Sequence, residues 1–162
     1  MSDETYRSDR RGANEHATPQ SGGAAGLSSR DVFRWPVRVY YEDTDAGGVV
    51  YHARYLNFCE RARTEWLRSR GWEQDVLRDQ YHVLFVVARA SLEYRRPARF
   101  NDSLDVTCEV ARLRAAAIEF TQRVEHSADS AVLCGVSVRV VCVDARTFRP
   151  KPIPESILES FA

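Results

Sequence analysis

The stretch that decides the fold is ARYLNFCERARTEWLRSRG, residues 53–71. Apolar side chains recur in it every three or four residues, which is the spacing of one face of an α-helix. One stripe of this kind consists of Tyr55, Phe58, Cys59, Ala62 and Trp66, and a second is formed by Leu56 and Leu67. Apolar residues therefore cover much of the circumference, which predicts a helix that the rest of the protein largely encloses. Gly71 is the expected end of this helix.

The residues after the helix carry strand patterns. VLFVVA (83–88) is apolar on both faces, which is typical of a central strand. LDVTCEV (104–110) and IEFTQRVE (118–125) alternate apolar with polar residues, and VLCGVSVRVVCV (132–143) predicts a long strand. HSADS (126–130) between the last two is typical of a hairpin turn. We therefore expect about four strands in an antiparallel meander.

Shorter elements complete the predicted domain. VRVYY (37–41) favours a strand, residues 73–80 a short helix, and ESILESF (155–161) a last helical turn after Pro154. One long helix against a curved antiparallel sheet gives an α+β fold. A sheet this small has exposed edges, and pairing with a second copy of the chain would cover one of them.

Residues 1–30 contain almost nothing to bury and are rich in Ser, Gly, Ala, Asp and Arg. Such a segment cannot offset its ordering entropy, so we expect a disordered N-terminal tail. The folded domain is then expected over residues 31–162, a length sufficient for one hydrophobic core.

Composition excludes several classes of function. The 162 residues include 23 basic and 23 acidic ones, so no net field draws the protein to nucleic acid or to an anionic membrane. The four cysteines form no CxxC pair and sit in apolar runs, which favours buried free thiols in a reducing compartment. No apolar run approaches the ~18 residues of a membrane span, and the N-terminus lacks the apolar middle of a signal peptide. We expect a cytoplasmic protein.

The residues just before the long helix could form a reaction site. DTDAGGVVYH (43–52) joins a strand end to the helix start, where the first N–H groups lack partners and carry partial positive charge. Gly47 and Gly48 allow a sharp turn and the close approach of another molecule. A carbonyl oxygen at this position would be polarised as in an oxyanion hole. Asp45 stands beside it as a general base or nucleophile, which suits acyl transfer or hydrolysis.

Each of these residues also has a structural interpretation. Asp and Gly are common at helix starts and in turns. We expect Asp43 to accept hydrogen bonds from backbone N–H groups of the turn, and His52 could be a helix-start residue only. Asp43, Asp45 and His52 lack a further ligand to complete a metal site, so no metal is expected.

Glu60 is a second carboxylate on the same helix. It lies eight residues after His52, so two helical turns place both residues on one face. It could act as an auxiliary acid or base. Its spacing to Arg63 and Thr64 favours instead an ion pair or a hydrogen bond within the helix.

The segment VRVYYEDTDAGGVVYHARYLNFCERARTEWL (37–67) strongly resembles the hotdog-fold thioesterases. It looks most like the Tol–Pal-associated subgroup of the 4-hydroxybenzoyl-CoA thioesterase family, with DTDAGGVVYH as the specific match and ERARTE (60–65) continuing it. FVVARASLEYRRPARFNDSLDV (85–106) and VVCVDARTFRPKPIP (140–154) are also similar, so the resemblance covers roughly residues 35–160. It implies a hotdog fold, in which a curved antiparallel sheet wraps the long helix.

The resemblance also implies roles for the residues of the motif. Asp45 matches the catalytic carboxylate of the family, and His52 falls at the helix start whose backbone N–H polarises the thioester carbonyl. The imidazole of His52 would orient water or the substrate. Gly48 and Tyr51, in the same run, are further candidates for contact with the substrate.

Related proteins join their sheets edge to edge, with active sites between two protomers. The resemblance therefore implies a homodimer, or a homotetramer built from such dimers. RLRAAA (112–117) is similar to a basic turn that meets CoA in the benzoyl-CoA relative, which makes Arg112 and Arg114 candidates for binding the CoA phosphates. The alternative is that both are solvated arginines of a hairpin.

The expected activity is hydrolysis of acyl-CoA, with acyl carrier protein as an alternative carrier and without a cofactor. Because a thioester carbonyl is activated and thiolate leaves readily, one carboxylate plus an oriented dipole suffices. Asp45 would either deprotonate water or attack to give a mixed anhydride. Two other functions remain open, namely an enoyl-thioester hydratase or dehydratase of the same fold, and a non-catalytic partner of envelope or lipid-synthesis proteins that binds acyl carrier protein.

Overall fold

A computed structural model describes residues 32–161, and the predicted disordered tail, residues 1–30, lies outside the described residues. The described part contains five strands, three α-helices and one 3-10 helix. In chain order these are β1 (Phe33–Arg38), η1 (Tyr41–Asp43), α1 (Arg54–Ser69), α2 (Gln74–Gln80), β2 (Val83–Tyr94), β3 (Ser103–Arg114), β4 (Ala117–His126), β5 (Val132–Asp144) and α3 (Glu155–Ser160). None of the helices in this part is long and apolar enough to cross a membrane.

The strands form one antiparallel sheet in the order β1-β3-β4-β5-β2. The predicted meander is correct for β3, β4 and β5, each of which pairs with the next along the chain. It is wrong for β2, which lies beside β5 at the far edge instead of beside β3. The connection of residues 95–102 spans the end of the sheet, where the N–H groups of Arg95 and Arg96 donate to Leu133 O. This anchoring lets the chain pass from one edge to the other.

The expectation that residues 83–88 form a central strand is also wrong for the single chain, because β2 is an edge strand. Its side chains are more exposed towards its end, and Val87 is 51% exposed. Its pairing with β5 shifts register between Val87 and Arg89, where a bulge interrupts the ladder.

The first strand begins and ends earlier than the pattern of residues 37–41 predicts. Strand β1 ends at Arg38, and the chain then enters the short helix η1. The cause is Asp43, whose carboxylate accepts a hydrogen bond from the Tyr40 N–H at 2.9 Å and pulls the chain into a tight turn.

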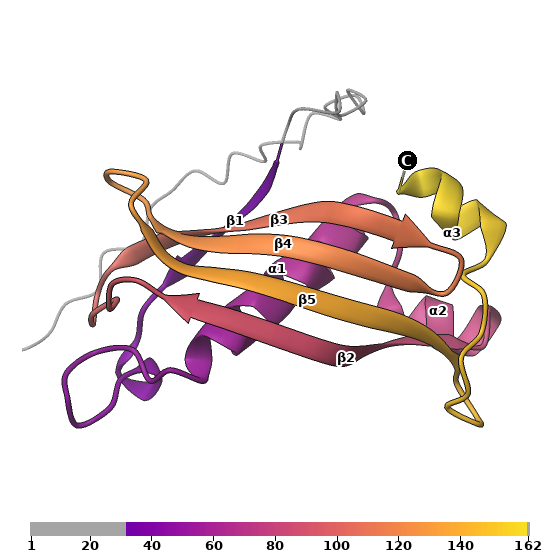
Figure 1. Cartoon of the computed structure of the whole chain (residues 1–162), viewed down its shortest axis with the longest axis horizontal. Coiled ribbons are helices and arrows are strands. Elements are labelled where there is room, and N and C mark those ends of the chain that lie inside the picture. The colour runs from indigo at the N-terminus through magenta and orange to yellow at the C-terminus, as the bar shows by residue number, and fades with distance from the viewer. Residues whose placement is uncertain (1–31, 162) are drawn as a thin grey trace, which may run out of the picture. The chain divides into compact units, whose positions relative to one another are not determined.

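Helix α1 lies along one face of the curved sheet (Figure 1). The predicted enclosure is wrong for the single chain, because the side of the helix that carries Asn57, Arg61 and Arg68 is exposed. Its buried residues meet the inward side chains of the sheet, and the Trp66 and Phe120 rings pack edge to face with centroids 5.2 Å apart. The helix ends next to Gly71, whose φ of 85° is left-handed. Figure 1 shows η1 and the loop after it at one end of the sheet, with α2 and α3 at the other.

The buried face of α1 leads to a prediction about stability. Phe58 is fully buried between the helix and the sheet, so Phe58→Ala should lower the free energy of unfolding by about 3–5 kcal/mol in urea denaturation. The same change at Phe148, which is 63% exposed, should alter it by less than about 0.5 kcal/mol. Equal effects at the two positions would contradict a core organised around α1.

Candidate active site

The loop before α1 turns back on itself and pairs Asp45 with Val49, a few residues before the helix start. Thr44 and Val50 form a β-bridge, the Asp45 N–H donates to Val49 O at 3.0 Å, and the Gly48 N–H donates to Asp45 O at 2.9 Å. Gly48 has a φ of 72°, a conformation that glycine adopts without strain. The sequence prediction of a sharp turn at this glycine is therefore confirmed.

The Asp45 side chain is exposed and is oriented by the same turn. Its Oδ1 accepts a hydrogen bond from the Gly47 N–H at 2.8 Å. A Cβ at position 47 would lie 3.0 Å from this oxygen, so only glycine fits there without moving the carboxylate. The other oxygen, Oδ2, forms no hydrogen bond within residues 32–161. One oxygen of Asp45 is thus held, and the other is available.

The start of α1 presents unpaired backbone donors. The His52 and Ala53 N–H groups find no acceptor in the part of the chain that the structure describes, whereas the Arg54 N–H donates to Tyr51 O at 2.8 Å. Such N–H groups at a helix start carry partial positive charge. The imidazole of His52 is exposed, and its ring lies 4.3 Å from that of Tyr51, centroid to centroid.

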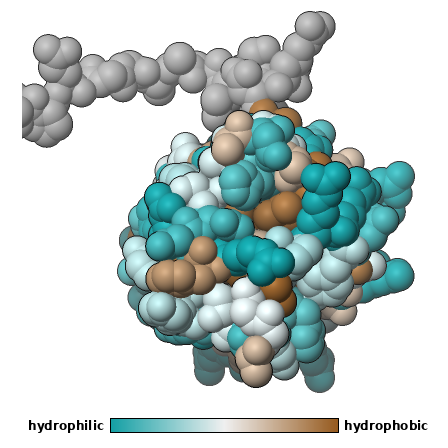
Figure 2. Space-filling model, turned by 90° about the vertical axis from the view of Figure 1, so that its left-hand side faces the viewer, coloured by the Kyte–Doolittle hydropathy of each residue, from teal (hydrophilic) through white to brown (hydrophobic). Residues whose placement is uncertain are grey.

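Two tyrosines that the sequence analysis did not assign to the site fix this helix start. The Tyr94 hydroxyl donates to His52 O at 2.9 Å, and the Tyr55 hydroxyl accepts a hydrogen bond from the Ala98 N–H at 2.9 Å. The end of β2 and the β2–β3 connection therefore hold the first turn of α1 in place. Figure 2 looks onto this end of the domain, where small apolar patches lie among mostly hydrophilic residues.

Asp43 has the structural role that the sequence favours. Its side chain is buried, its Oδ2 accepts the Tyr40 N–H, and its Oδ1 lies 3.7 Å from Arg54 Nε. The Asp43 backbone carbonyl also accepts the Tyr51 N–H at 2.8 Å. Asp43 thus holds the loop together from inside, and Asp45 faces outward.

Glu60 forms the predicted contacts within α1, with an ion pair to Arg63 and a weaker hydrogen bond from Thr64 Oγ1 at 3.5 Å. Arg63 is itself buried and donates from Nη1 to Gln122 Oε1 at 2.7 Å. The sequence did contain a signal for Gln122, because this polar residue stands between the inward Phe120 and Val124 of β4. A polar side chain at a core position needs a buried partner.

Arg112 and Arg114 lie near the end of β3, next to the β3–β4 hairpin. Asp45 is beside the opposite end of the same strand, because Val39 bonds with Asn101 and Asp102 just before β3. At about 3.3 Å per residue, the 11 steps from Ser103 to Arg114 span roughly 36 Å. Within one chain, the structure does not bring the two arginines to Asp45.

Other chemistries find little support among the described residues. No group of three or more His, Cys, Asp or Glu side chains is arranged there to hold a metal ion. Burial raises the pKa of Cys59 and Cys108 to about 12 and that of Cys134 and Cys142 to about 11. These thiols stay protonated at neutral pH, so they are poor nucleophiles.

Comparison with known proteins shows what the chain resembles. The family model for the thioesterase-like superfamily matches residues 39–161. The acyl-CoA thioester hydrolase YbgC of Escherichia coli O6:H1 is 48% identical over 130 residues, which are 80% of this chain and 96% of that protein. The acyl-CoA thioesterase YbgC of Haemophilus influenzae is 44% identical over 129 residues, covering 80% and 93%. A probable thioesterase of Bartonella henselae has a solved structure with a TM-score of 0.72 at 31% identity, covering 76% of this chain and all of that one.

The two aspartates of the loop should respond differently to removal. Asp43→Ala removes the acceptor of the Tyr40 N–H and the carboxylate that faces Arg54, so the free energy of unfolding should fall by about 1–3 kcal/mol. Asp45→Ala removes one exposed hydrogen bond and should lower it by less than about 1 kcal/mol. Urea denaturation of both variants measures the difference, and a larger loss for Asp45 would contradict this assignment of roles.

Proposed function

The chain belongs to the thioesterase-like superfamily, and on this premise we propose that it hydrolyses acyl-CoA thioesters to a free acid and a thiol. The predicted hotdog fold is confirmed by the solved thioesterase structure that the chain resembles, and the chain has the α+β arrangement of a helix against an antiparallel sheet. Within this fold, Asp45 and His52 are the proposed catalytic residues.

The observation that supports the proposal is the turn that pairs Thr44 and Asp45 with Val50 and Val49, the residues that shortly precede the start of α1. A thioester carbonyl oxygen would accept a hydrogen bond from the unpaired His52 N–H. The helix dipole would stabilise the negative charge that develops on this oxygen during the reaction. Gly48 leaves space for the substrate to approach the backbone, and Tyr51 would contact the substrate beside the His52 ring.

Two routes are compatible with this arrangement. As a general base, Asp45 takes a proton from water, the oxygen adds to the carbonyl carbon, and the C–S bond breaks as the thiolate takes up the proton. As a nucleophile, an Asp45 oxygen displaces the thiolate to give a mixed anhydride, which water then hydrolyses. Both routes use the same oxygen of Asp45, the one that Gly47 does not hold.

A homodimer through strand β2 would complete the site, and pairs of such dimers would give a tetramer. Strand β2 is a sheet edge in the single chain, yet its first half is apolar on both faces, as in a central strand. Two β2 edges paired antiparallel would place the Tyr94 end of one copy beside the Val83 end of the other. The Asp45 loop of one copy would then lie in the same half of the dimer as Arg112 and Arg114 of the second copy.

These arginines would bind the phosphates of CoA, since guanidinium groups pair well with phosphate oxygens. Arg114 also forms an ion pair with Glu119 at 3.4 Å, so the binding of a CoA phosphate by Arg114 would break this ion pair. Acyl carrier protein is the alternative carrier of the acyl group.

Asp45→Asn should lower the rate of thiol release by at least ~100-fold, which is the scale of a missing general base. Its melting temperature should stay close to that of the native protein. Asp129→Asn is the matched control, because Asp129 also accepts a backbone N–H within an exposed turn, at 3.0 Å from Ala131 N. Full activity in a folded Asp45→Asn variant would exclude the proposed role.

The double variant Arg112→Ala/Arg114→Ala should raise KM for acyl-CoA by about tenfold, the effect expected from losing charge-assisted phosphate contacts. The same acyl group on N-acetylcysteamine has no phosphates, and its KM should not change. Arg61→Ala, an exposed arginine of α1, serves as the control. A loss of the same size with both substrates would show that the arginines do not bind the nucleotide part of CoA.

A further inference from the structure

Two neighbouring hollows lie along α1 beneath the edge strand β2. The hollow closer to the helix start, here called the near hollow, has as its own lining Leu56, Asn57, Ala90 and Val138. The second, the far hollow, is walled by apolar residues that include Trp66, Phe85, Ile118, Phe120 and Val140. Glu60, Arg63 and Val87 line both hollows, so these three residues form the boundary between them.

The order of the hollows along α1 determines what could occupy them. Leu56 is one helical turn from His52, Glu60 is two turns away, and Trp66 is almost four. At 1.5 Å per residue, Glu60 lies about 12 Å and Trp66 about 21 Å along the helix from His52. An acyl group whose carbonyl sits at the His52 N–H would enter the near hollow first. It would reach the far hollow only by passing Glu60 and Arg63.

The boundary between the hollows contains the Glu60–Arg63 ion pair, and the Arg63 side chain is fixed in place. Arg63 is buried and bonded to Gln122, whose amide nitrogen donates to Cys59 O at 3.1 Å and to Thr107 O at 3.3 Å. The Glu60 side chain is 53% exposed and is therefore the half that could move.

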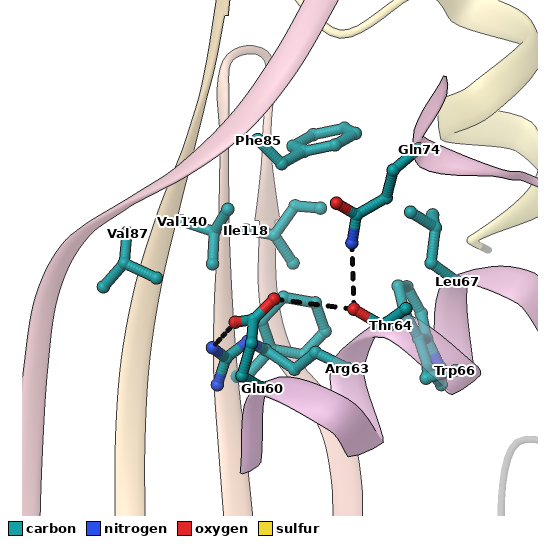
Figure 3. Close-up of a pocket in the computed structure, with 11 residues that line it drawn as sticks. Glu60, Arg63, Thr64, Trp66, Leu67, Gln74, Phe85, Val87, Ile118 and Val140 are labelled. Carbon is teal, nitrogen blue, oxygen red and sulfur yellow. Dashed lines mark hydrogen bonds and ion pairs between the residues drawn. The ribbon is translucent and has the colours of Figure 1, made fainter. Parts of the chain in front are cut away.

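Glu60 also belongs to a polar row on the helix side of the far hollow. Thr64 Oγ1 lies 3.5 Å from Glu60 Oε1 and accepts a hydrogen bond from Gln74 Nε2 at 2.9 Å. Figure 3 shows this row facing the apolar side chains of Phe85, Val87, Ile118 and Val140 across the hollow. The apolar wall of the far hollow is thus suited to methylene groups, and the Glu60–Arg63 ion pair lies at the entrance to this hollow.

Building on the proposed thioesterase function, we propose that the Glu60–Arg63 ion pair sets the length of the acyl chain that the protein accepts. A short acyl group ends in the near hollow and leaves the pair intact. A long one must lie across the pair and displace Glu60, which leaves the buried Arg63 guanidinium without a carboxylate. An alkyl chain supplies no acceptor in its place, and an uncompensated buried charge is strongly unfavourable.

The test uses two CoA thioethers that cannot be hydrolysed, S-butyl-CoA and S-decyl-CoA, and measures their dissociation constants by titration calorimetry with the full chain. The native protein should bind both within about threefold, because the extra methylene groups stay out of the far hollow. The variant Glu60→Ala/Arg63→Met replaces the ion pair with apolar groups. It should bind S-decyl-CoA at least about tenfold more tightly than S-butyl-CoA, since the methylene groups are then buried.

The matched control is Glu65→Ala/Arg68→Met, which makes the same two changes in another i,i+3 ion pair of α1 that lines neither hollow. It should keep the native affinity ratio. Glu60→Ala alone retains the Arg63–Gln122 bond and carries the test if the double variant does not fold. Its affinity ratio should shift in the same direction, by at least about threefold.

Three results would overturn the proposal. One is a native protein that already prefers S-decyl-CoA by tenfold or more. Another is a native protein that binds neither thioether. The third is an unchanged affinity ratio in the folded variants, and if these variants also lose thiol release from butyryl-CoA, Glu60 acts as an acid or base instead. Failure of the native protein to release thiol would count against the thioesterase function, while the affinity ratio would still report on the ion pair.

Discussion

The structure depends on the burial of the apolar face of α1. The antiparallel sheet curves around this face, while residues such as Asn57, Arg61 and Arg68 on the other side of the helix stay exposed. The buried face is occupied by this packing, and the helix start is left at one end of the sheet. Backbone N–H groups at that end have no intrahelical acceptors, so an electropositive point faces outward. The proposed polarisation of a thioester carbonyl therefore takes place at the helix start, the part of α1 that the packing leaves uncovered.

The loop before α1 is held next to this electropositive helix start by hydrogen bonds of its buried residues. The buried Asp43 carboxylate accepts a hydrogen bond from the Tyr40 N–H, which closes the loop on itself. The Tyr55 hydroxyl accepts a hydrogen bond from the Ala98 N–H, which attaches the helix start to the β2–β3 connection. Asp45 and His52 are exposed on a loop that these buried bonds hold in place. One aspartate is buried and fixes the loop, and the other is exposed for chemistry, which explains why two carboxylates occur two positions apart in a motif that needs only one for the reaction.

Sequence alone predicted the elements whose patterns are strong. The helical stripe of residues 53–71 and the alternation within β3 and β4 are decided by local periodicity, and both are confirmed. The place of β2 in the sheet was not predictable, since an apolar run such as VLFVVA is equally compatible with an edge strand that pairs with a second chain. The early end of β1 depends on one hydrogen bond, from the Tyr40 N–H to the Asp43 carboxylate, and no sequence pattern predicts this bond. Tyr94 and Tyr55 were missed as anchors of the helix start for the same reason, because their partners are backbone groups more than 40 residues away.

The central claim is that the start of α1 polarises a thioester carbonyl beside Asp45. Infrared difference spectroscopy can observe this directly, with an acyl-CoA labelled with carbon-13 at the carbonyl and bound to the Asp45→Asn variant, which should bind the substrate but turn it over slowly. The account predicts that the carbonyl stretching band moves to lower frequency on binding, because hydrogen bonding and the helix dipole weaken the C=O bond. A band at the frequency of the free thioester in solution, with the substrate demonstrably bound, would contradict it.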